Sequence, residues 1–215
     1  MIITAVEPAQ KRRGRVNVYV DGVAAFDVAR TTATSRGLRP GAAIDEARIE
    51  AIVAADRRRA ALETAAAMLA RRPRSEREMR RQLAQRRFDA SQIEETVTRL
   101  RELKLLDDAE FARTWTESRD RSSPRGRRLI VQELRAAGVA APTAVEAASA
   151  VSEDEAAYRV GEKKARALAS CDDRAFRDKL GAHLQRRGFG WEMARATVDR
   201  CWRERQGATV DAADE

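Results

Sequence analysis

The chain has 215 residues, of which 42 are Lys or Arg and 34 are Asp or Glu, so its formal net charge is +8. No apolar run reaches the roughly 18 residues of a membrane-spanning helix, and the first residues lack the basic and then apolar segments of a signal peptide. We therefore expect a cytoplasmic protein without membrane association. The excess positive charge lies within residues 1–106, which bears on partners rather than on fold.

Residues 1–44 are predicted to form a small antiparallel β region. The segment "RVNVYVDGVAAFDV", which begins at Arg15, alternates valines with polar residues, as a half-buried strand does. Asp21-Gly22 is a preferred pair for a hairpin turn, so "VAAFDV" is predicted to be the partner strand. "IITAVEP" adds a third strand that ends at Pro8. The intervening "AQKRRGR" is predicted to be a basic hairpin tip, either a solvated turn or a binding surface.

From about residue 45 the pattern is helical and it repeats. Leu83, Leu134 and Leu184 occupy equivalent positions, 51 and 50 residues apart, and each follows a large apolar residue by four positions. This period accommodates three short helices, so we predict a mainly α fold with three tandem three-helix units. Such units share cores with their neighbours, so we expect an elongated curved stack. The predicted parts are the β region at 1–44, a bridging helix with the first unit at 45–106, the second unit at 107–151, the third unit at 152–206 and a disordered acidic tail at 207–215.

Helix-start and helix-stop signals agree with this division. Gly138 and Gly188 lie where a glycine commonly follows a helix C-terminus. N-caps are expected at the following residues, each with the residue that would complete its cap: Ser75 with Glu78, Ser91 with Glu94, Asp107 with Glu110, Ser123 before Pro124, and Ser152 with Glu155.

The segment "RRPRSEREMRRQLAQRRF", residues 71–88, holds eight arginines. On a helical wheel Met79 and Leu83 mark the inner face, while Arg77 and Arg81 lie opposite. Arg74 would extend this row by one turn. The charge is therefore predicted to form a solvent-facing row.

The row has counterparts in the second unit but not in the third. Arg125 and Arg128 are equivalent to Arg74 and Arg77, whereas the third unit has uncharged or acidic residues there. A directional binding surface explains this asymmetry; an ordinary solvated arginine-rich face is the alternative. The predicted partner- or nucleic-acid-binding residues are Arg71, Arg72, Arg74, Arg77, Arg81, Arg125, Arg127 and Arg128, with Lys11, Arg12 and Arg13 at the hairpin tip.

Signatures of catalysis are missing from the sequence. There is no glycine-rich phosphate loop, zinc-binding pattern or nucleophile elbow, so we predict no enzymatic activity, no metal and no cofactor. Cys171 and Cys201 are expected to be plain buried thiols, and His183 is given no functional role. The tryptophans have helical core spacing and are expected to be buried: Trp115, Trp191 and Trp202.

These segments resemble the RecX family of bacterial regulatory proteins over residues 70–140. The residues that carry the resemblance are Arg74-Ser75-Glu76, Leu83, the run from Leu106 to Ala112 ("LDDAEFA"), Gly126, and "ELRAAGV" from Glu133 to Val139. The likeness is weaker in the third unit.

The resemblance implies three tandem three-helix units and a modulator of RecA, usually an inhibitor. Family members bind the RecA filament on single-stranded DNA, in or along its groove, and block strand exchange, coprotease activity and ATP hydrolysis. We therefore expect a monomeric regulator of recombination and the SOS response that contacts the RecA filament and single- and double-stranded DNA. The alternative is a sequence-tolerant DNA-binding protein that acts by competition for DNA.

Overall fold

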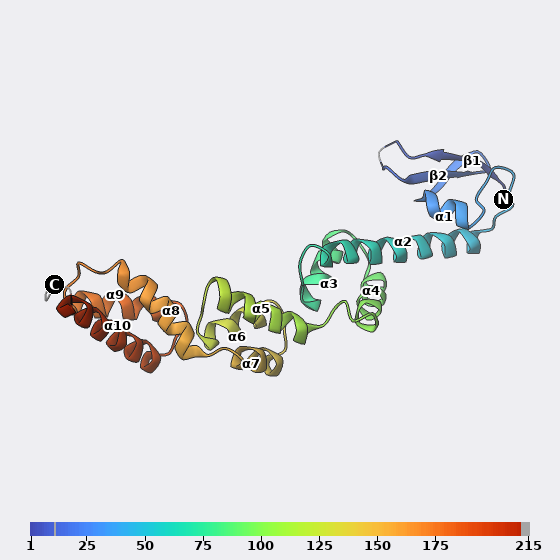
Figure 1. Cartoon of the computed structure of the whole chain (residues 1–215). Coiled ribbons are helices and arrows are strands. Elements are labelled where there is room, and N and C mark those ends of the chain that lie inside the picture. The colour runs from blue at the N-terminus through green and yellow to red at the C-terminus, as the bar shows by residue number, and fades with distance from the viewer. Residues whose placement is uncertain (11, 212–215) are drawn as a thin grey trace. The chain divides into compact units, whose positions relative to one another are not determined.

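Figure 1 shows the computed structural model, which describes residues 1–10 and 12–211. Within these residues the chain forms three strands and ten helices, so the prediction of a mainly α fold with an N-terminal antiparallel sheet is confirmed. The chain divides into two compact units. Unit 1 comprises Met1–Arg72 and Met79–Leu105, and unit 2 comprises Pro73–Glu78 and Leu106–Glu215.

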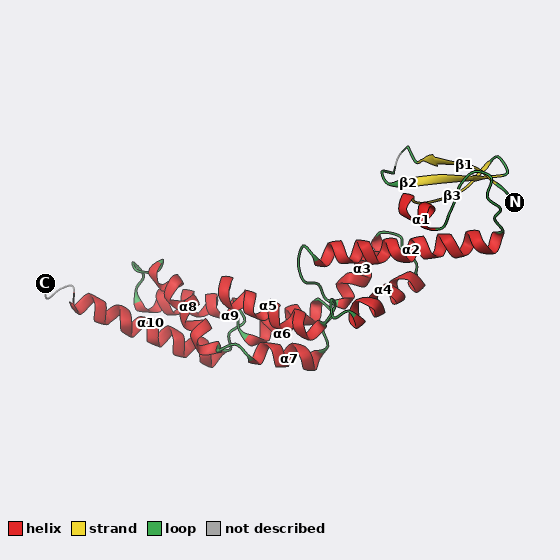
Figure 2. Ribbon diagram, turned by 45° about the vertical axis from the view of Figure 1, so that its right-hand side comes forward, coloured by secondary structure: helices red, strands yellow, loops and turns green. Residues whose placement is uncertain are grey.

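An antiparallel sheet begins unit 1, with its strands in chain order (Figure 2). The strands are β1 (Ile3–Pro8), β2 (Arg15–Val20) and β3 (Val23–Ala29). Asp21 and Gly22 both have positive φ, at 50° and 85°, which confirms the predicted tight turn between β2 and β3. Val16, Val18 and Val20 are buried, as their alternation predicts.

A buried carboxylate joins this sheet to the helices that follow it. These helices are α1 (Arg30–Ser35) and α2 (Glu46–Leu69). Asp56 of α2 is only 3% exposed and accepts hydrogen bonds from the Ala29 N–H at 3.0 Å and the Thr32 hydroxyl at 2.6 Å. Its other oxygen lies 3.0 Å from Nη2 of Arg15. One side chain therefore connects β2, the β3–α1 junction and α2.

The first three-helix unit combines α2 with two shorter helices. These are α3 (Glu76–Gln85) and α4 (Ala90–Glu102). Met79 and Leu83 of α3 and Val97 and Leu100 of α4 are completely buried, as the repeat predicts for the inner face. Ten helical residues in α3 supply only this narrow apolar stripe, so the neighbouring helices must complete the core.

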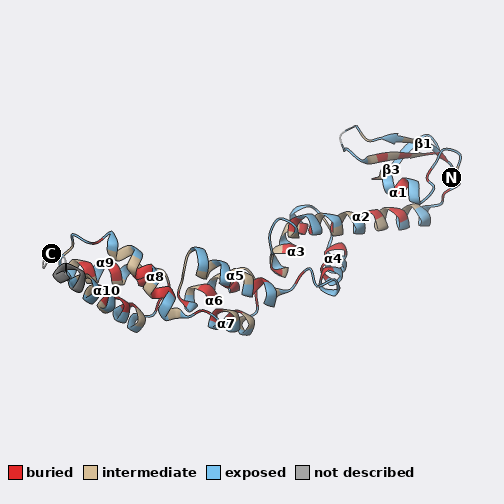
Figure 3. Cartoon of the chain, in the orientation of Figure 1, coloured by how far each residue is buried: buried red, intermediate tan, exposed pale blue. Residues whose placement is uncertain are grey.

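Unit 2 contains the second and third three-helix units. The second consists of α5 (Asp108–Ser122), α6 (Arg127–Ala136) and α7 (Ala141–Ser149), and the third of α8 (Glu153–Arg166), α9 (Asp173–Arg186) and α10 (Trp191–Asp211). Ile130 and Leu134 of α6 belong to the same hydrophobic cluster as Phe176, Leu180 and Leu184 of α9. Figure 3 shows buried positions along each of these helices. The two bundles thus share one core, as neighbouring repeats are expected to do.

The predicted N-caps are correct at Ser75 and Asp107. The Ser75 hydroxyl accepts from the Glu78 N–H at 3.1 Å and donates to the Ala137 carbonyl at 2.5 Å. The Asp107 carboxylate accepts from the Ala109 N–H at 2.8 Å and from the Glu110 N–H at 3.2 Å.

Three of the predicted caps are wrong or incomplete. Helix α4 is capped by Asp89, which forms a reciprocal box with Gln92, because the helix begins before Ser91. Ser123 terminates α5 instead of starting α6, and α6 begins after Gly126. Ser152 precedes α8, but its side chain accepts no cap hydrogen bond.

The middle helix of each three-helix unit ends at a residue with left-handed backbone conformation. Gly138 after α6 and Gly188 after α9 have φ of +98° and +88°, which confirms their prediction as helix-ending glycines. In the first unit Arg87 takes the equivalent place with φ of 64°. A side chain with a Cβ atom is strained in this region, by roughly 1 kcal/mol.

Two bundles of unit 2 meet backbone to backbone at Gly126. Its N–H donates to the Arg187 carbonyl at 2.9 Å. A Cβ atom added at Gly126 would lie 2.2 Å from the Gly188 carbonyl oxygen, so no side chain fits there. This contact holds the α5–α6 connection against the end of α9. It also explains why α6 starts later than Ser123 and Pro124 predict.

Helix α10 continues to Asp211, five residues beyond the predicted end of the third unit at 206. No proline follows to stop it. Residues 212–215 of the predicted acidic tail lie outside the described residues, and the predicted domain boundaries stay predictions.

Replacing Asp56 with Ala would remove the acceptor of the Ala29 N–H and of the buried Thr32 hydroxyl, and one of the two carboxylates beside the Arg15 guanidinium. We expect Asp56→Ala to lower the free energy of unfolding by roughly 3 kcal/mol, measured by urea unfolding with far-UV circular dichroism. Glu50 is exposed on the same helix, and Glu50→Ala is the matched control, with an expected change below about 0.5 kcal/mol. Equal effects of the two substitutions would contradict the role of Asp56.

Arg87→Gly should stabilise the protein, because glycine adopts positive φ without a Cβ penalty. The expected gain is about 0.5 kcal/mol after the larger backbone entropy of glycine in the unfolded chain is subtracted. Arg86→Gly is the control: it removes the same side chain from a neighbouring residue without positive φ, so it should lower stability. Thermal unfolding of both variants tests the prediction, and a loss of stability in Arg87→Gly would refute it.

Candidate functional site

Three predicted arginines are exposed and carry uncompensated charge. They are Arg77 and Arg81, one turn apart on α3, and Arg128 in the first turn of α6. No carboxylate in the described part of the chain pairs with them. The aliphatic part of Arg77 lies against the Cα of Gly138, because an added Cβ there would meet the Arg77 Cβ and Cδ at 2.4 Å. Packing thus restrains its stem and leaves its guanidinium in solvent.

Two members of the predicted row form internal ion pairs, so they are not the solvent-facing charges that the wheel predicts. Arg74 pairs with Glu78, and both side chains are 14% exposed. Arg125 pairs with Glu133, with side chains 28% and 14% exposed. Glu78 lies in α3, which follows Arg74, and Glu133 lies in α6, which follows Arg125, so each carboxylate compensates the arginine before its helix.

Glu133 is the centre of a cationic cluster between α5 and α6. Its Oε2 accepts from the Arg119 Nε at 2.9 Å and from the Trp115 indole N–H at 3.0 Å. The Arg119 guanidinium also lies over the Trp115 ring, 4.6 Å from its centroid. Burial, and the neighbouring charges of Arg119 and Arg187, lower the pKa of Arg125 from its ordinary value. One carboxylate thus offsets several converging guanidinium groups.

The remaining residues of the prediction are partly paired and partly exposed. Arg127 donates to the Val151 carbonyl, at 2.8 Å from Nη2, so it has a structural partner. Arg71, Arg72 and Arg13 are exposed. Lys11 lies outside the described residues. Whether these side chains bind a partner stays a prediction.

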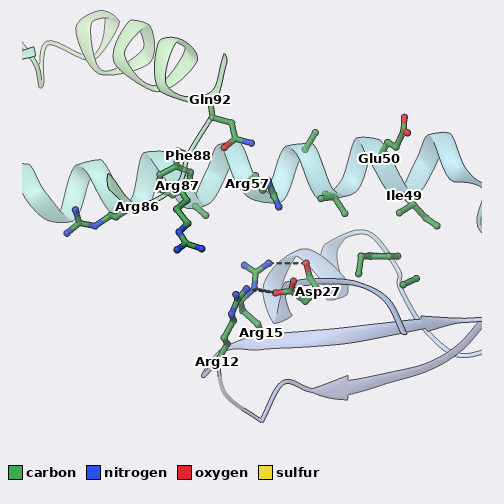
Figure 4. Close-up of a pocket in the computed structure, with 15 residues that line it drawn as sticks. Arg12, Arg15, Asp27, Ile49, Glu50, Arg57, Arg86, Arg87, Phe88 and Gln92 are labelled. Atoms are coloured by element: carbon green, nitrogen blue, oxygen red, sulfur yellow. Dashed lines mark hydrogen bonds and ion pairs between the residues drawn. The ribbon is translucent and has the colours of Figure 1, made fainter. Parts of the chain in front are cut away.

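Arg12 lines a groove of unit 1 that the sequence did not predict (Figure 4). The groove has a volume of about 780 Å³ and lies between the sheet and the helices. On the sheet side, Asp27 holds Arg15 by a bond of 2.5 Å to Nε and Arg12 by one of 3.3 Å to Nη1. Burial would raise the pKa of Asp27, but the hydrogen bond and charge of Arg15, aided by Arg12, hold it below its ordinary value.

The helical side of the groove adds three cations that the sequence prediction missed. Arg57 comes from α2, and Arg86 and Arg87 follow the end of α3. No carboxylate within the described residues pairs with them, although Arg86 Nη1 donates to the Gln82 carbonyl at 3.2 Å. Arg86 and Arg87 belong to the arginine-rich segment but lie beyond its helical row. Only the turn that ends α3 brings them to the groove.

The positions of the tryptophans differ in part from the prediction that all three are buried. Trp115 and Trp202 pack against the core of unit 2, as expected. The assignment of Trp191 to the core is wrong, because 62% of this residue is exposed. It is the first residue of α10, where helical spacing does not ensure a covering neighbour, and the Arg195 guanidinium lies 5.3 Å from its ring centroid.

A metal site requires a group of ligating side chains. Among the described residues, no three His, Cys, Asp or Glu side chains are grouped as metal ligands would be. Cys171 and Cys201 are free. Cys201 is buried, as expected, and burial raises the pKa of its thiol to about 11. Cys171 is only partly buried, so the expectation of a buried thiol is wrong there. None of the described helices has the length and apolar character needed to cross a membrane.

Comparison with known protein families gives three matches in tandem. Residues 61–100 match the first three-helix domain of RecX, residues 107–147 the second, and residues 152–198 the third. The third match covers the part of the chain where the motif resemblance was weaker.

Comparison with curated proteins and with solved structures also finds RecX proteins. The chain is 34% identical to the regulatory protein RecX of Levilactobacillus brevis, covering 92% of this chain and 76% of that protein. It is 28% identical to the regulatory protein RecX of Listeria monocytogenes, covering 100% of this chain and 79% of that protein. A crystal structure of regulatory protein RecX matches with a TM-score of 0.66 and 27% identity, covering 92% of this chain and 98% of that one. RecX from Lactobacillus salivarius has the same fold, with a TM-score of 0.63 and 20% identity over 68% of this chain and 97% of that one.

Glu133→Gln should destabilise unit 2, because the amide keeps an acceptor for Trp115 but loses the charge that offsets Arg119 and Arg125. We expect the free energy of unfolding to fall by about 2 kcal/mol. All three tryptophans lie in unit 2, so urea unfolding followed by tryptophan fluorescence reports on it directly. Glu146→Gln, at an exposed residue of α7, is the control and should change stability little; an equal loss there would contradict the prediction.

Proposed function

The chain belongs to the RecX family of regulatory proteins, and on that premise we propose that it regulates the RecA recombinase by binding the RecA filament on single-stranded DNA. Bound in the groove of the filament, it inhibits strand exchange, ATP hydrolysis and coprotease activity. In this proposal the protein acts in the cytoplasm as a monomer, within the SOS response, and contacts single- and double-stranded DNA. It acts by binding alone and needs no catalytic residue or cofactor.

The observation that carries the proposal is the set of exposed, unpaired guanidinium groups at Arg77, Arg81 and Arg128. A filament of protein on DNA presents phosphates and acidic side chains in a regular array. Each exposed contact to such a surface contributes little alone. Several contacts made by one chain add through effective concentration and become strongly salt-dependent.

The predicted row therefore contains two kinds of arginine. Arg74 and Arg125 are compensated internally, each by a carboxylate of the helix that follows it. Arg77, Arg81 and Arg128 have no such partner among the described residues, so we propose that they contact the filament. The cations of the unit 1 groove are a second candidate contact, because Arg57, Arg86 and Arg87 also lack carboxylate partners within the described chain.

A sequence-tolerant DNA-binding protein that competes with RecA for DNA is the second candidate. The observation in its favour is the exposed Trp191, whose ring could stack on a base while Arg195 contacts a phosphate. Capture of RecA by this protein after digestion of all nucleic acid separates the two candidates. Retained RecA would exclude competition for DNA as the full explanation.

Reversing the three unpaired charges, in Arg77→Glu/Arg81→Glu/Arg128→Glu, should weaken inhibition of RecA ATP hydrolysis on single-stranded DNA. We expect the half-inhibitory concentration to rise at least about tenfold, because three exposed contacts of roughly 0.5–1 kcal/mol each become repulsive. Inhibition should also depend less on salt than in the unmodified protein, since fewer counterions are released. The measurement is an ATPase titration at two salt concentrations.

The control for this experiment is a second triple variant, which changes the net charge by the same amount at three arginines outside the predicted binding residues. Arg36, Arg39 and Arg174 are exposed and lie outside the predicted binding residues, so their reversal to Glu should leave the half-inhibitory concentration within about twofold. Circular dichroism verifies that both triple variants fold. If the two variants inhibit equally, the filament contact proposed for Arg77, Arg81 and Arg128 is refuted.

A further inference from the structure

A basic cavity lies in unit 2, in the part of the chain whose overall charge is balanced. It has a volume of about 450 Å³ and is lined by the C-terminal end of α5, the connection to α6, one face of α8 and the end of α9. Five cationic side chains line it. Arg159 from α8 is paired with Asp120, and the other four are Arg121 from α5, Lys163 and Lys164 from α8, and Arg187 after α9.

The carboxylate at this cavity is already neutralised. Asp120 forms an ion pair with Arg159, which also donates to the Asp120 carbonyl at 3.3 Å. Within the described residues, no carboxylate pairs with Arg121, Lys163, Lys164 or Arg187. Like charges therefore converge from three helices without a counter-charge. Their repulsion is lowest when an anion occupies the space between them.

The hydrogen-bonding groups of the cavity are mostly donors. Arg187 Nη1 donates to the Ser123 hydroxyl oxygen at 2.9 Å, which leaves the Ser123 O–H free to donate. The other N–H groups of its guanidinium fork, and the ammonium groups of Lys163 and Lys164, are further donors. Several charged donors around one space match the oxygens of a tetrahedral oxyanion, and such bonds are about twice as strong as neutral ones.

From this arrangement we infer that the cavity between α5, α8 and α9 binds a phosphate group. Arg121, Lys163, Lys164 and Arg187 supply the positive charge, and the Ser123 hydroxyl donates a hydrogen bond. Both a free phosphate and the phosphodiester of a nucleic acid present this chemistry. The inference does not depend on the proposed action on RecA, because the cavity and its charges belong to unit 2 alone.

The only histidine of the chain, His183, lines the same cavity and can report on it. Burial lowers its pKa from the ordinary value, and the charges of Arg187, Lys164 and Arg186 lower it further. The charged groups around it come from three helices. They are Arg186 at the end of α9 and Arg187 after it, Arg159, Lys163 and Lys164 from α8, and Asp120 and Arg121 from α5. A bound phosphate adds negative charge beside the imidazole, so it favours the protonated form and raises the pKa of His183.

The experiment is an NMR pH titration of the His183 imidazole in the full-length protein. Three samples are compared at equal ionic strength: sodium chloride alone, inorganic phosphate, and a single-stranded thymidine oligonucleotide. The chloride sample matters because screening of Lys164 and Arg187 raises the pKa of His183 without any specific binding. A rise beyond the chloride value in phosphate identifies a free phosphate ligand, and a rise with the oligonucleotide alone identifies a phosphodiester. Either result supports the inference.

Two variants test whether the rise depends on the cavity. Lys163→Gln/Lys164→Gln removes two of its cations, so the ligand-induced rise should disappear and the dissociation constant should increase at least about tenfold. This variant also raises the pKa of His183 in the free protein, so the quantity compared is the change on adding ligand. Arg174→Gln removes an exposed charge from the first turn of α9, outside the cavity, and should keep the full response.

The inference is overturned if neither ligand raises the pKa of His183 beyond the chloride value. It is also overturned if the rise survives in Lys163→Gln/Lys164→Gln, or is lost equally in Arg174→Gln. Lys163 is exposed and Lys164 half-buried, so the double variant is expected to fold, and a matching circular dichroism spectrum verifies this.

Discussion

Each three-helix unit depends on a middle helix that stops abruptly and lets the chain reverse over a small core. Helix α3 ends before Arg87, α6 before Gly138 and α9 before Gly188, and each of these residues has positive φ. The two leucines or their equivalents on each middle helix are completely buried, so a longer helix would carry polar residues past the edge of the core. The left-handed residue therefore sets the size of the repeat, and the third helix packs back where it does because of that stop.

The arginines of this chain serve two purposes, and the carboxylate nearby decides which. Where Glu78 or Glu133 lies within reach, the guanidinium is half-buried and fixes the segment before a helix to that helix. Arg77 and Arg81 form no ion pair with any of the described carboxylates, so their charge faces solvent and is available to a partner. Composition alone does not separate the two groups, because both arise from the same short arginine-rich segments.

Much of the fold could be predicted because its signals are local. Asp21-Gly22 specifies a hairpin turn from two residues, and the recurrence of Leu83 at Leu134 and Leu184 specifies the repeat. The N-cap of α4 could not be chosen so easily, since Ser91 with Glu94 and Asp89 with Gln92 have the same spacing. The surroundings of the arginines could be predicted least well. The partner of Arg125 comes from α6, and the groove cations Arg86 and Arg87 are brought to the sheet only by tertiary packing, which helical spacing does not encode.

The contact between Gly126 and Gly188 has a consequence for how unit 2 unfolds. Gly126 lies against the Gly188 carbonyl with no room for a Cβ atom, and its amide hydrogen is held by Arg187. Neither bundle can open there without breaking a hydrogen bond that belongs to both, and their apolar side chains form one continuous cluster. The second and third repeats should therefore unfold together as a single cooperative block, in contrast to the repeat-by-repeat melting of a looser array.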